Sequence, residues 1–288
     1  MNASNAPRPA AELQPALDQA LAVTASGVLR DTFIGQSRDY GMLRIYGGHL
    51  LGQALAAAFR TVAEDKVAHS LHAYFLKTGT PDEPIGYQVS RLRDGRRFVT
   101  REIRAVQDDQ TLMVMLASFK VEEAGDHHQP AMPAVPGADQ VAARRRRAGS
   151  GPLELPFAAG LGAELQPVDD WHPGAAAGGE PAITVWMRAV ASADADRRAR
   201  QCMLAYLSDG PLMFNALRPH GRPFVSHRAT SLDHALWFHR DVDPGGWLLF
   251  EQQGPAAADG RGFNQGRLYD AGGALVASVA QESMMRRL

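Results

Sequence analysis

Hydrophobic and polar residues alternate along this chain with two periods, one typical of helices and one typical of strands. Residues 49–62, which follow Gly47 and Gly48, are rich in Ala and Leu at helical spacing and predict a helix buried on nearly all sides. A short helix at 15–23 and a strand at 28–37 are expected before it. Four segments after it alternate as one-faced antiparallel strands do: 69–77, 85–93, 97–107 and 111–122.

The second half of the chain repeats this order. Alternating apolar residues predict a strand at 183–190, and an apolar ridge at helical spacing predicts a helix at 194–208, followed by a second helical run at 211–217. Four more strands are expected at 228–239, 247–253, 262–269 and 274–285. Each half therefore reads as a strand, a buried helix and four strands.

Short motifs that occur twice support a duplication. They lie 160 to 165 residues apart in a common order: D-G-R-x-F at 94–98 and 259–263, Ser-Leu at 70–71 and 231–232, and Ala-Ser at 117–118 and 277–278. Common order and spacing indicate a duplicated unit. A central helix wrapped by an antiparallel sheet is the plan of the hotdog fold. We therefore predict an α+β double hotdog, in which two tandem units pack as a pseudo-dimer within one chain.

The predicted boundaries give an N-terminal segment, a first unit, a linker and a second unit that carries the catalytic residues: 1–27, 28–123, 124–180 and 181–288. The linker is expected because its composition shifts to Ala, Pro, Gly and charged residues without periodicity. Its arginines at 144–147 and the pair His127-His128 are interpreted as solvated side chains rather than as a phosphate or metal site.

The composition narrows the classes of function. A formal net charge of −1 over 288 residues does not favour a nucleic-acid groove. No window approaches the roughly 18 uninterrupted apolar residues of a membrane span, so none is expected. The one cysteine, Cys202, fits a core thiol in a reducing cytoplasm. No phosphate loop, dinucleotide fingerprint, nucleophile elbow or zinc spacing occurs, and we expect neither a cofactor nor a metal.

Asp209 is the first candidate for chemistry. A register that pairs residues 53–55 with 215–217 places Asp209 opposite Gly47, at the head of the second unit's central helix. Residues 47–60 of the first unit contain no Asp or Glu. This asymmetry is expected of one composite active site, although a single Asp at such a place can also be a helix cap.

Two further polar residues can complete such a site. Ser231 lies near the start of a strand and Gln281 near the end of the last strand. Both side chains can hydrogen-bond a water whose proton Asp209 takes, whereas each alone is also compatible with an ordinary strand residue. Asp233 and His234 are interpreted as structural, because adjacent strand residues point to opposite faces.

Several longer motifs occur in a fixed order along the chain. They are Gly35-Gln36-Ser37, Tyr46-Gly47-Gly48, Gly52-Gln53-Ala54-Leu55, residues 69–76, Leu207-Ser208-Asp209, residues 231–234, Trp237-Phe238-His239, Arg261-Gly262-Phe263, Val276-Ala277-Ser278 and Gln281-Glu282. In this order they resemble the type II acyl-CoA thioesterases, which are double-hotdog enzymes. The resemblance covers about residues 29–287 and departs at His49, where the family usually has Gln, and at 210–213.

The resemblance implies a function and a site. The family hydrolyses fatty acyl-CoA to a free fatty acid and CoA, and its catalytic Asp, Ser or Thr, and Gln map onto Asp209, Ser231 and Gln281. It implies attack by water without a covalent intermediate. The backbone N–H groups of Gly47 and Gly48, at a helix start, are expected to bind the substrate by stabilising the oxyanion.

Two other functions fit the same fold. A hotdog enoyl-CoA hydratase needs an Asp and a His that converge on the substrate, and the sequence shows no such spacing in a loop before a helix. A catalytically silent acyl-CoA-binding protein does not need all three polar residues. The sequence leaves a homodimer or a higher homo-oligomer open, because it indicates no interface.

Overall fold

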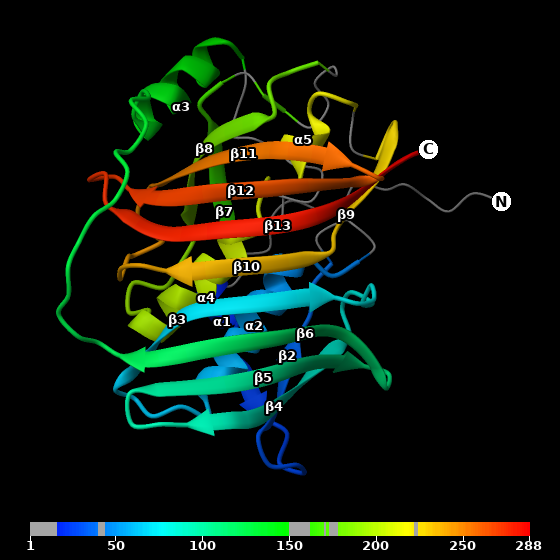
Figure 1. The fold of residues 1–288 in the computed structure, drawn as a ribbon, viewed down its shortest axis with the longest axis vertical. Coiled ribbons are helices and arrows are strands. Elements are labelled where there is room, and N and C mark those ends of the chain that lie inside the picture. Colours follow the sequence, from blue (N-terminus) through cyan, green and yellow to red (C-terminus); the bar gives the residue numbers. More distant parts are fainter. Residues whose placement is uncertain (1–15, 40–43, 150–161, 170, 173–177, 222–223) are drawn as a thin grey trace.

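The structure, a computed structural model, describes residues 16–39, 44–149, 162–169, 171–172, 178–221 and 224–288. These residues include one curved antiparallel sheet of 13 strands, with α2 (Gly47–Phe59) and α4 (Arg197–Ser208) behind it and α3 (Ala138–Arg147) at one end (Figure 1). The long strands arise where apolar and polar residues alternate, because successive strand side chains point to opposite faces.

The first half forms a helix followed by four long strands, as the pattern predicts. Its elements are α1 (Leu17–Ala20), β1 (Val23–Ala25), β2 (Thr32–Gln36), α2 (Gly47–Phe59), β3 (Lys66–Phe75), β4 (Pro84–Asp94), β5 (Phe98–Gln107) and β6 (Gln110–Val121). The helix expected at 49–62 begins earlier, because Gly47 and Gly48 form its first turn. β1 pairs with β2, so the first sheet starts before the expected boundary at residue 28.

The second half differs from the pattern in two places. Its elements are α3 (Ala138–Arg147), β7 (Ala163–Pro167), β8 (Ala182–Ala189), α4 (Arg197–Ser208), α5 (Phe214–Leu217), β9 (His227–Ser231), β10 (Asp233–Phe238), β11 (Leu248–Ala258), β12 (Arg261–Asp270) and β13 (Leu275–Arg287). The single strand expected at 228–239 is interrupted at Leu232, and its two parts, β9 and β10, both pair with β13.

The second difference concerns the segment 124–180, which the composition predicts as a plain linker. It contains α3, and it contains β7, which pairs with β8 at one end of the sheet. Val141 of α3 and Trp186 of β8 are buried in one apolar cluster, and the Trp186 indole donates to the Pro136 carbonyl. These parts of the segment are ordered because they cover apolar surface of the second unit.

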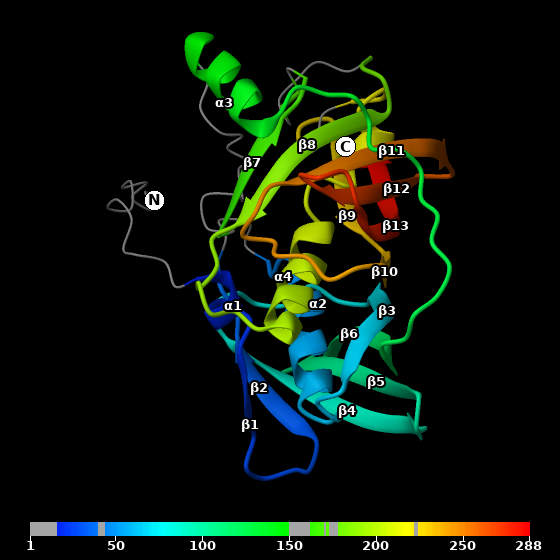
Figure 2. The ribbon, with the colours of Figure 1, turned by 90° about the vertical axis from the view of Figure 1, so that its left-hand side faces the viewer.

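The two units share the sheet through β3 and β10. Its strand order is β1-β2-β4-β5-β6-β3-β10-β13-β12-β11-β8-β7. β3 and β10 are antiparallel neighbours, with Leu71 opposite Leu236. Figure 2 shows α2 and α4 in the hollow of the curved sheet. Each unit is therefore a hotdog, and the predicted intrachain pseudo-dimer is confirmed.

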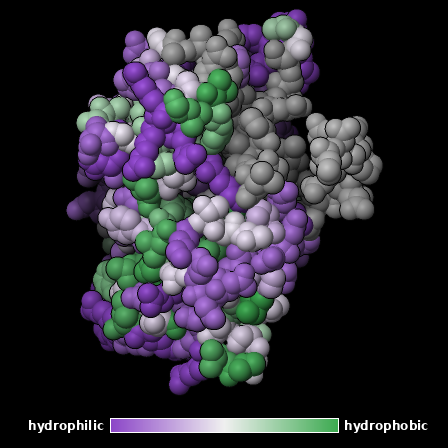
Figure 3. Space-filling model, turned by 90° about the vertical axis from the view of Figure 1, so that its right-hand side faces the viewer, coloured by the Kyte–Doolittle hydropathy of each residue, from purple (hydrophilic) through white to green (hydrophobic). Residues whose placement is uncertain are grey.

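α2 is buried on nearly all sides, as its apolar run predicts. Leu51, Ala54 and Leu55 have no exposed surface, because the strands of the first unit cover one side of α2 and α4 covers the other. One apolar cluster runs through both units and includes residues of α2, α4 and the sheet. On the face seen in Figure 3, hydrophobic residues lie in small groups among hydrophilic ones. Among the described residues, no helix is long and apolar enough to span a membrane.

In the second unit, α5 occupies the place that α2 has in the first. It packs on β11, β12 and β8, as α2 packs on β4, β5 and β2. Gln53 accepts a hydrogen bond from the Tyr87 hydroxyl (2.9 Å), and Asn215 donates one to Gln252 (3.1 Å). Gln53 thus corresponds to Asn215, as in the predicted register. The second helix is divided, however, and Asp209 is the C-cap residue of α4 rather than the head of a continuous helix.

One of the repeated motifs does not correspond in the fold. Ser70 lies inside β3 and pairs with Ser118, whereas Ser231 ends β9 and pairs with Ser283 rather than with Ser278. The interruption between β9 and β10 shifts the chain along β13 at this point. As a result, Ser231 has a different position in the sheet from Ser70, its match in the repeated motif.

Candidate active site

Two helix ends meet where the units join. The first turn of α2, at Gly47 and Gly48, lies against the C-terminal end of α4. A β-carbon on Gly48 would lie 2.3 Å from the Tyr206 carbonyl oxygen, and one on Gly47 would lie 2.7 Å from Oδ2 of Asp209. Both positions require glycine, because a side chain would push the helix ends apart.

Asp209 is held by donors from both units. Its Oδ2 accepts the N–H of Gly48 at 2.8 Å. Its Oδ1 accepts Nε2 of Gln281 at 2.5 Å and the hydroxyl of Ser231 at 3.4 Å. The end of β9 and the middle of β13 thus bring Ser231 and Gln281 to one helix end, so the three residues predicted as catalytic lie together.

The pKa of Asp209 is raised from 3.8 to about 7. Burial is the main cause, because the residue is 5 % exposed and its charged form loses hydration; hydrogen bonds from Gln281, Gly48 and Ser231 and the positive charge of Arg44 offset part of this. The carbonyl groups at the end of α4 also disfavour a negative charge there. Asp209 therefore titrates near neutral pH, where a general base works best.

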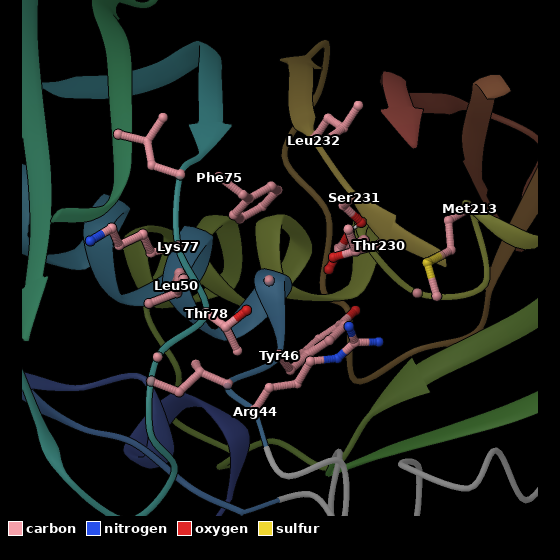
Figure 4. A pocket seen from close by; sticks show the side chains of 16 residues that line it. Arg44, Tyr46, Leu50, Phe75, Lys77, Thr78, Met213, Thr230, Ser231 and Leu232 are labelled. Atoms are coloured by element: carbon pink, nitrogen blue, oxygen red, sulfur yellow. Dashed lines mark hydrogen bonds between the residues drawn. The ribbon is translucent and has the colours of Figure 1, made fainter. Parts of the chain in front are cut away.

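A pocket opens beside Asp209 and Ser231. Figure 4 shows it between Arg44, Tyr46 and Phe75 of the first unit and Ser231 of the second. The rest of its lining combines five apolar side chains with two threonines, one further cation and three glycines: Ile45, Leu50, Leu76, Met213, Leu232, Thr78, Thr230, Lys77, Gly47, Gly79 and Gly210. Such a lining suits a ligand with an apolar chain and a polar reacting end.

Comparison with known proteins places the chain in a family. Family models described as the acyl-CoA thioesterase N-terminal and C-terminal domains match residues 36–120 and 125–285. The curated relative "Acyl-CoA thioesterase 2" of Haemophilus influenzae is 35% identical, and the match covers 88% of this chain and 92% of the relative. The chain belongs to the acyl-CoA thioesterase family.

Solved structures of similar proteins agree with this membership. An acyl-CoA thioesterase II, TesB2, from Mycobacterium marinum has a TM-score of 0.77 at 33% identity, over 95% of this chain and 99% of that one. A protein from Alicyclobacillus acidocaldarius described as having a hot dog fold has a TM-score of 0.74 at 19% identity, over 94% of this chain and 97% of that one, which supports the fold alone. The family and the fold that the motifs predict are confirmed.

His49, where this thioesterase departs from the usual Gln, has a structural partner. The residue is fully buried, and its Nε2 lies 3.0 Å from the Gln36 carbonyl oxygen at the end of β2. Burial lowers the pKa of His49 to about 4, so the ring is neutral at physiological pH. His49 therefore connects the start of α2 to β2 through this contact, and the contacts of Asp209 are unaffected.

His234 belongs to the surroundings of the site, although the alternation of strand residues predicts a structural role for it. Its Nδ1 lies 3.2 Å from Nε2 of Gln281 and 4.0 Å from Oδ1 of Asp209. Adjacent strand residues point to opposite faces, and Asp233, the neighbour of His234, accordingly is not fully buried. The same alternation places His234 on the buried face with Leu236, and that was the signal available in the sequence.

The positive charge that acts on Asp209 is that of Arg44. No sequence pattern indicates this residue, because it lies in irregular chain before α2. Burial lowers the pKa of Arg44 itself, and its guanidinium lies 5.3 Å from the centre of the Phe224 ring. Within the part of the chain that the structure describes, no three His, Cys, Asp or Glu side chains are grouped so that they could hold a metal ion.

Proposed function

We propose that the protein hydrolyses acyl-CoA thioesters to a free acid and CoA by direct attack of water. The observation that carries the proposal is that Ser231 and Gln281 meet on one oxygen of Asp209, at the wall of a partly apolar pocket. The relatives named acyl-CoA thioesterases support the substrate class.

In this proposal Asp209 is the general base. A water held by Asp209 and Ser231 gives a proton to the carboxylate as its oxygen forms a bond to the thioester carbon. The tetrahedral intermediate then collapses, and Asp209 returns the proton to the leaving sulfur. No residue becomes acylated.

The two glycines take different roles. The N–H of Gly48, expected from the sequence to stabilise the oxyanion, donates to Asp209 and so holds the base in place. Gly47 is the first residue of α2 and lines the pocket, and its N–H lies outside the hydrogen bonds of the helix itself. We assign the oxyanion to Gly47. The cations Arg44 and Lys77 suit the phosphate groups of CoA.

The position of His234 argues against a hydratase. Asp209 and His234 lie close together, as hydration of an enoyl-CoA would need, but the His234 side chain has no exposed surface and is not part of the pocket lining. A ring so enclosed does not reach a substrate carbon.

Release of thiol from purified protein tests the proposal. Acyl-CoAs of several chain lengths are offered, and acid and thiol are measured through the first turnover. We expect both in equal amounts from the start, and loss of both in Asp209→Asn. A burst of thiol ahead of acid would indicate an acyl-enzyme, hydration of an enoyl-CoA would indicate the hydratase, and binding without release would indicate a silent module.

We also propose that residues 28–123 and 181–288 act together as one catalytic unit. We further propose that the protein is located in a reducing cytoplasm. The support for the location is Cys202, the one cysteine of the sequence, which is buried and whose pKa is raised by burial. Fractionation of cells tests the location, and light scattering of the purified chain tests for the homodimer that the sequence leaves open.

A further inference from the structure

A chain of hydrogen bonds runs from Asp209 away from the pocket. Gln281 donates to Asp209, and the same Nε2 lies 3.2 Å from Nδ1 of His234. On the other side of the ring, Nε2 of His234 lies 2.8 Å from the hydroxyl of Ser208, the last residue of α4. The Ser208 hydroxyl also donates to the Ala205 carbonyl at 2.8 Å.

These contacts determine which ring nitrogen carries the proton. The hydroxyl of Ser208 has one proton, and the Ala205 carbonyl can only accept it. With that proton directed at Ala205, Nε2 of His234 is the donor to Ser208, and Nδ1 is left as an acceptor. Burial lowers the pKa of His234 to about 3, so the ring stays neutral, as this arrangement requires.

An acceptor at Nδ1 fixes the amide of Gln281. The NH2 group has two protons, and both have partners: Oδ1 of Asp209 and Nδ1 of His234. If the amide turned over, its oxygen would face the ionised Asp209 carboxylate and the His234 lone pair, and both contacts would be repulsive. In the observed orientation Oε1 of Gln281 is buried and, among the described residues, has no hydrogen-bond partner.

We propose that His234 is a positioning residue that holds the Gln281 amide with its NH2 toward Asp209 and its Oε1 available to accept a hydrogen bond from the attacking water. The inference rests on the proposed function for the role of Oε1, but not for the bonds themselves. Ser208 supports His234 by accepting its Nε2–H.

Among the residues that the structure describes, two charged or titratable side chains act on Asp209 or face it. Arg44 acts on it from the chain before α2, and His234 faces it from β10. The donors Gly48, Ser231 and Gln281 do not titrate. The hydrogen bond from Gln281 lowers the pKa of Asp209, so loss of the amide orientation should raise that pKa.

Kinetics of two substitutions test the role. His234→Leu removes the acceptor, whereas the Oδ1 of Asn in His234→Asn can take the place of Nδ1. For His234→Leu we expect kcat to fall about tenfold to 100-fold with KM within twofold, and the acid limb of the kcat profile to move to higher pH. For His234→Asn we expect most of kcat and the original limb to return.

His239→Leu is the matched control. His239 follows the same strand and contacts the Ser278 hydroxyl at 2.8 Å, which is the length of the His234–Ser208 contact, but it does not line the pocket beside Asp209. It should leave kcat and the pH profile unchanged. If His234→Leu does not fold, Ser208→Ala replaces it, with a smaller change in the same direction. If kcat falls equally in His234→Leu and His234→Asn and the acid limb of the pH profile does not move, the proposal is wrong and His234 only fills space in the core.

A second measurement separates this inference from the proposed function. Nitrogen-15 NMR of labelled histidine in the unaltered protein reports whether Nδ1 or Nε2 of His234 carries the proton. We expect the proton on Nε2. A proton on Nδ1 overturns the inference whatever the activity, whereas a proton on Nε2 in a protein that releases no thiol overturns only the proposed function.

Discussion

The backbone N–H of Gly48 donates to Oδ2 of Asp209 at 2.8 Å, so the N-terminal end of α2 in one unit supports the carboxyl group at the C-terminal end of α4 in the other. The positive end of one helix thereby offsets the carbonyl end of the other at the same carboxyl group. The arrangement of donors around Asp209 therefore needs both units, because Ser231 and Gln281 come from the second unit and Gly48 comes from the first.

The close approach at Gly48 gives a first prediction. In Gly48→Ala the new methyl group would lie 2.3 Å from the Tyr206 carbonyl oxygen, which is backbone and cannot move alone. We expect the helix ends to separate, kcat to fall about 100-fold and stability to fall by about 1–3 kcal/mol. Steady-state kinetics and urea unfolding measure both. Gly86→Ala is the control, because its methyl group would meet its nearest atom at an ordinary 3.6 Å.

Removal of either side-chain donor to Asp209 gives a second prediction. Ser231→Ala and Gln281→Ala each take away one partner of the carboxylate or of the water, and we expect kcat to fall on the order of 100-fold with little change in KM. Ser278→Ala serves as control, because this strand hydroxyl contacts His239 and not Asp209. Normal turnover in both variants would mean that the water is held elsewhere.

The sequence predicts most of the fold because burial in a hotdog leaves a clear pattern. α2 is enclosed, so nearly all of its residues are apolar, and the strands have one buried face, so they alternate. The alternation breaks around Leu232, where Thr230-Ser231 and Asp233-His234 each place two polar residues in succession, but the letters alone do not show that the strand is divided there. The division depends on how β9 and β10 pair with β13, which is a contact between distant parts of the chain.

Part of the candidate site is also predictable from the sequence. Asp209 stands at the end of an apolar ridge in one unit only, and the family motifs single out Ser231 and Gln281. The role of His234 could not be predicted in this way. That role depends on its contact with Gln281, 47 residues away, and on the pairing of β10 with β13. Its alternation with Leu236 predicts burial but not the partner.

The raised pKa of Asp209 gives a third prediction, for activity. A general base must be ionised to accept a proton, and this carboxyl group has a pKa of about 7. We expect kcat to rise about tenfold for each pH unit below 7 and to level off above it. Asp209→Asn keeps the size of the side chain but cannot take the proton, so its kcat should be roughly 100-fold to 10,000-fold lower and lack this limb. A limb that persists in Asp209→Asn would belong to another group.

The same pKa gives a fourth prediction, for stability. Between pH 3.8 and about 7 the folded protein keeps the Asp209 proton while the unfolded chain has released it, so the free energy of unfolding falls as the pH rises through this window. The full contribution corresponds to roughly 4 kcal/mol at pH 8. Asn does not titrate, so the stability of Asp209→Asn relative to the unaltered protein should grow from pH 4 to pH 8. His49 and His234 have lowered pKa values and contribute in the opposite sense, but both proteins contain them and the difference cancels their effect. Urea unfolding of the two proteins at pH 4, 6 and 8 measures this difference, and a value that stays constant across the series would mean that Asp209 is ionised throughout.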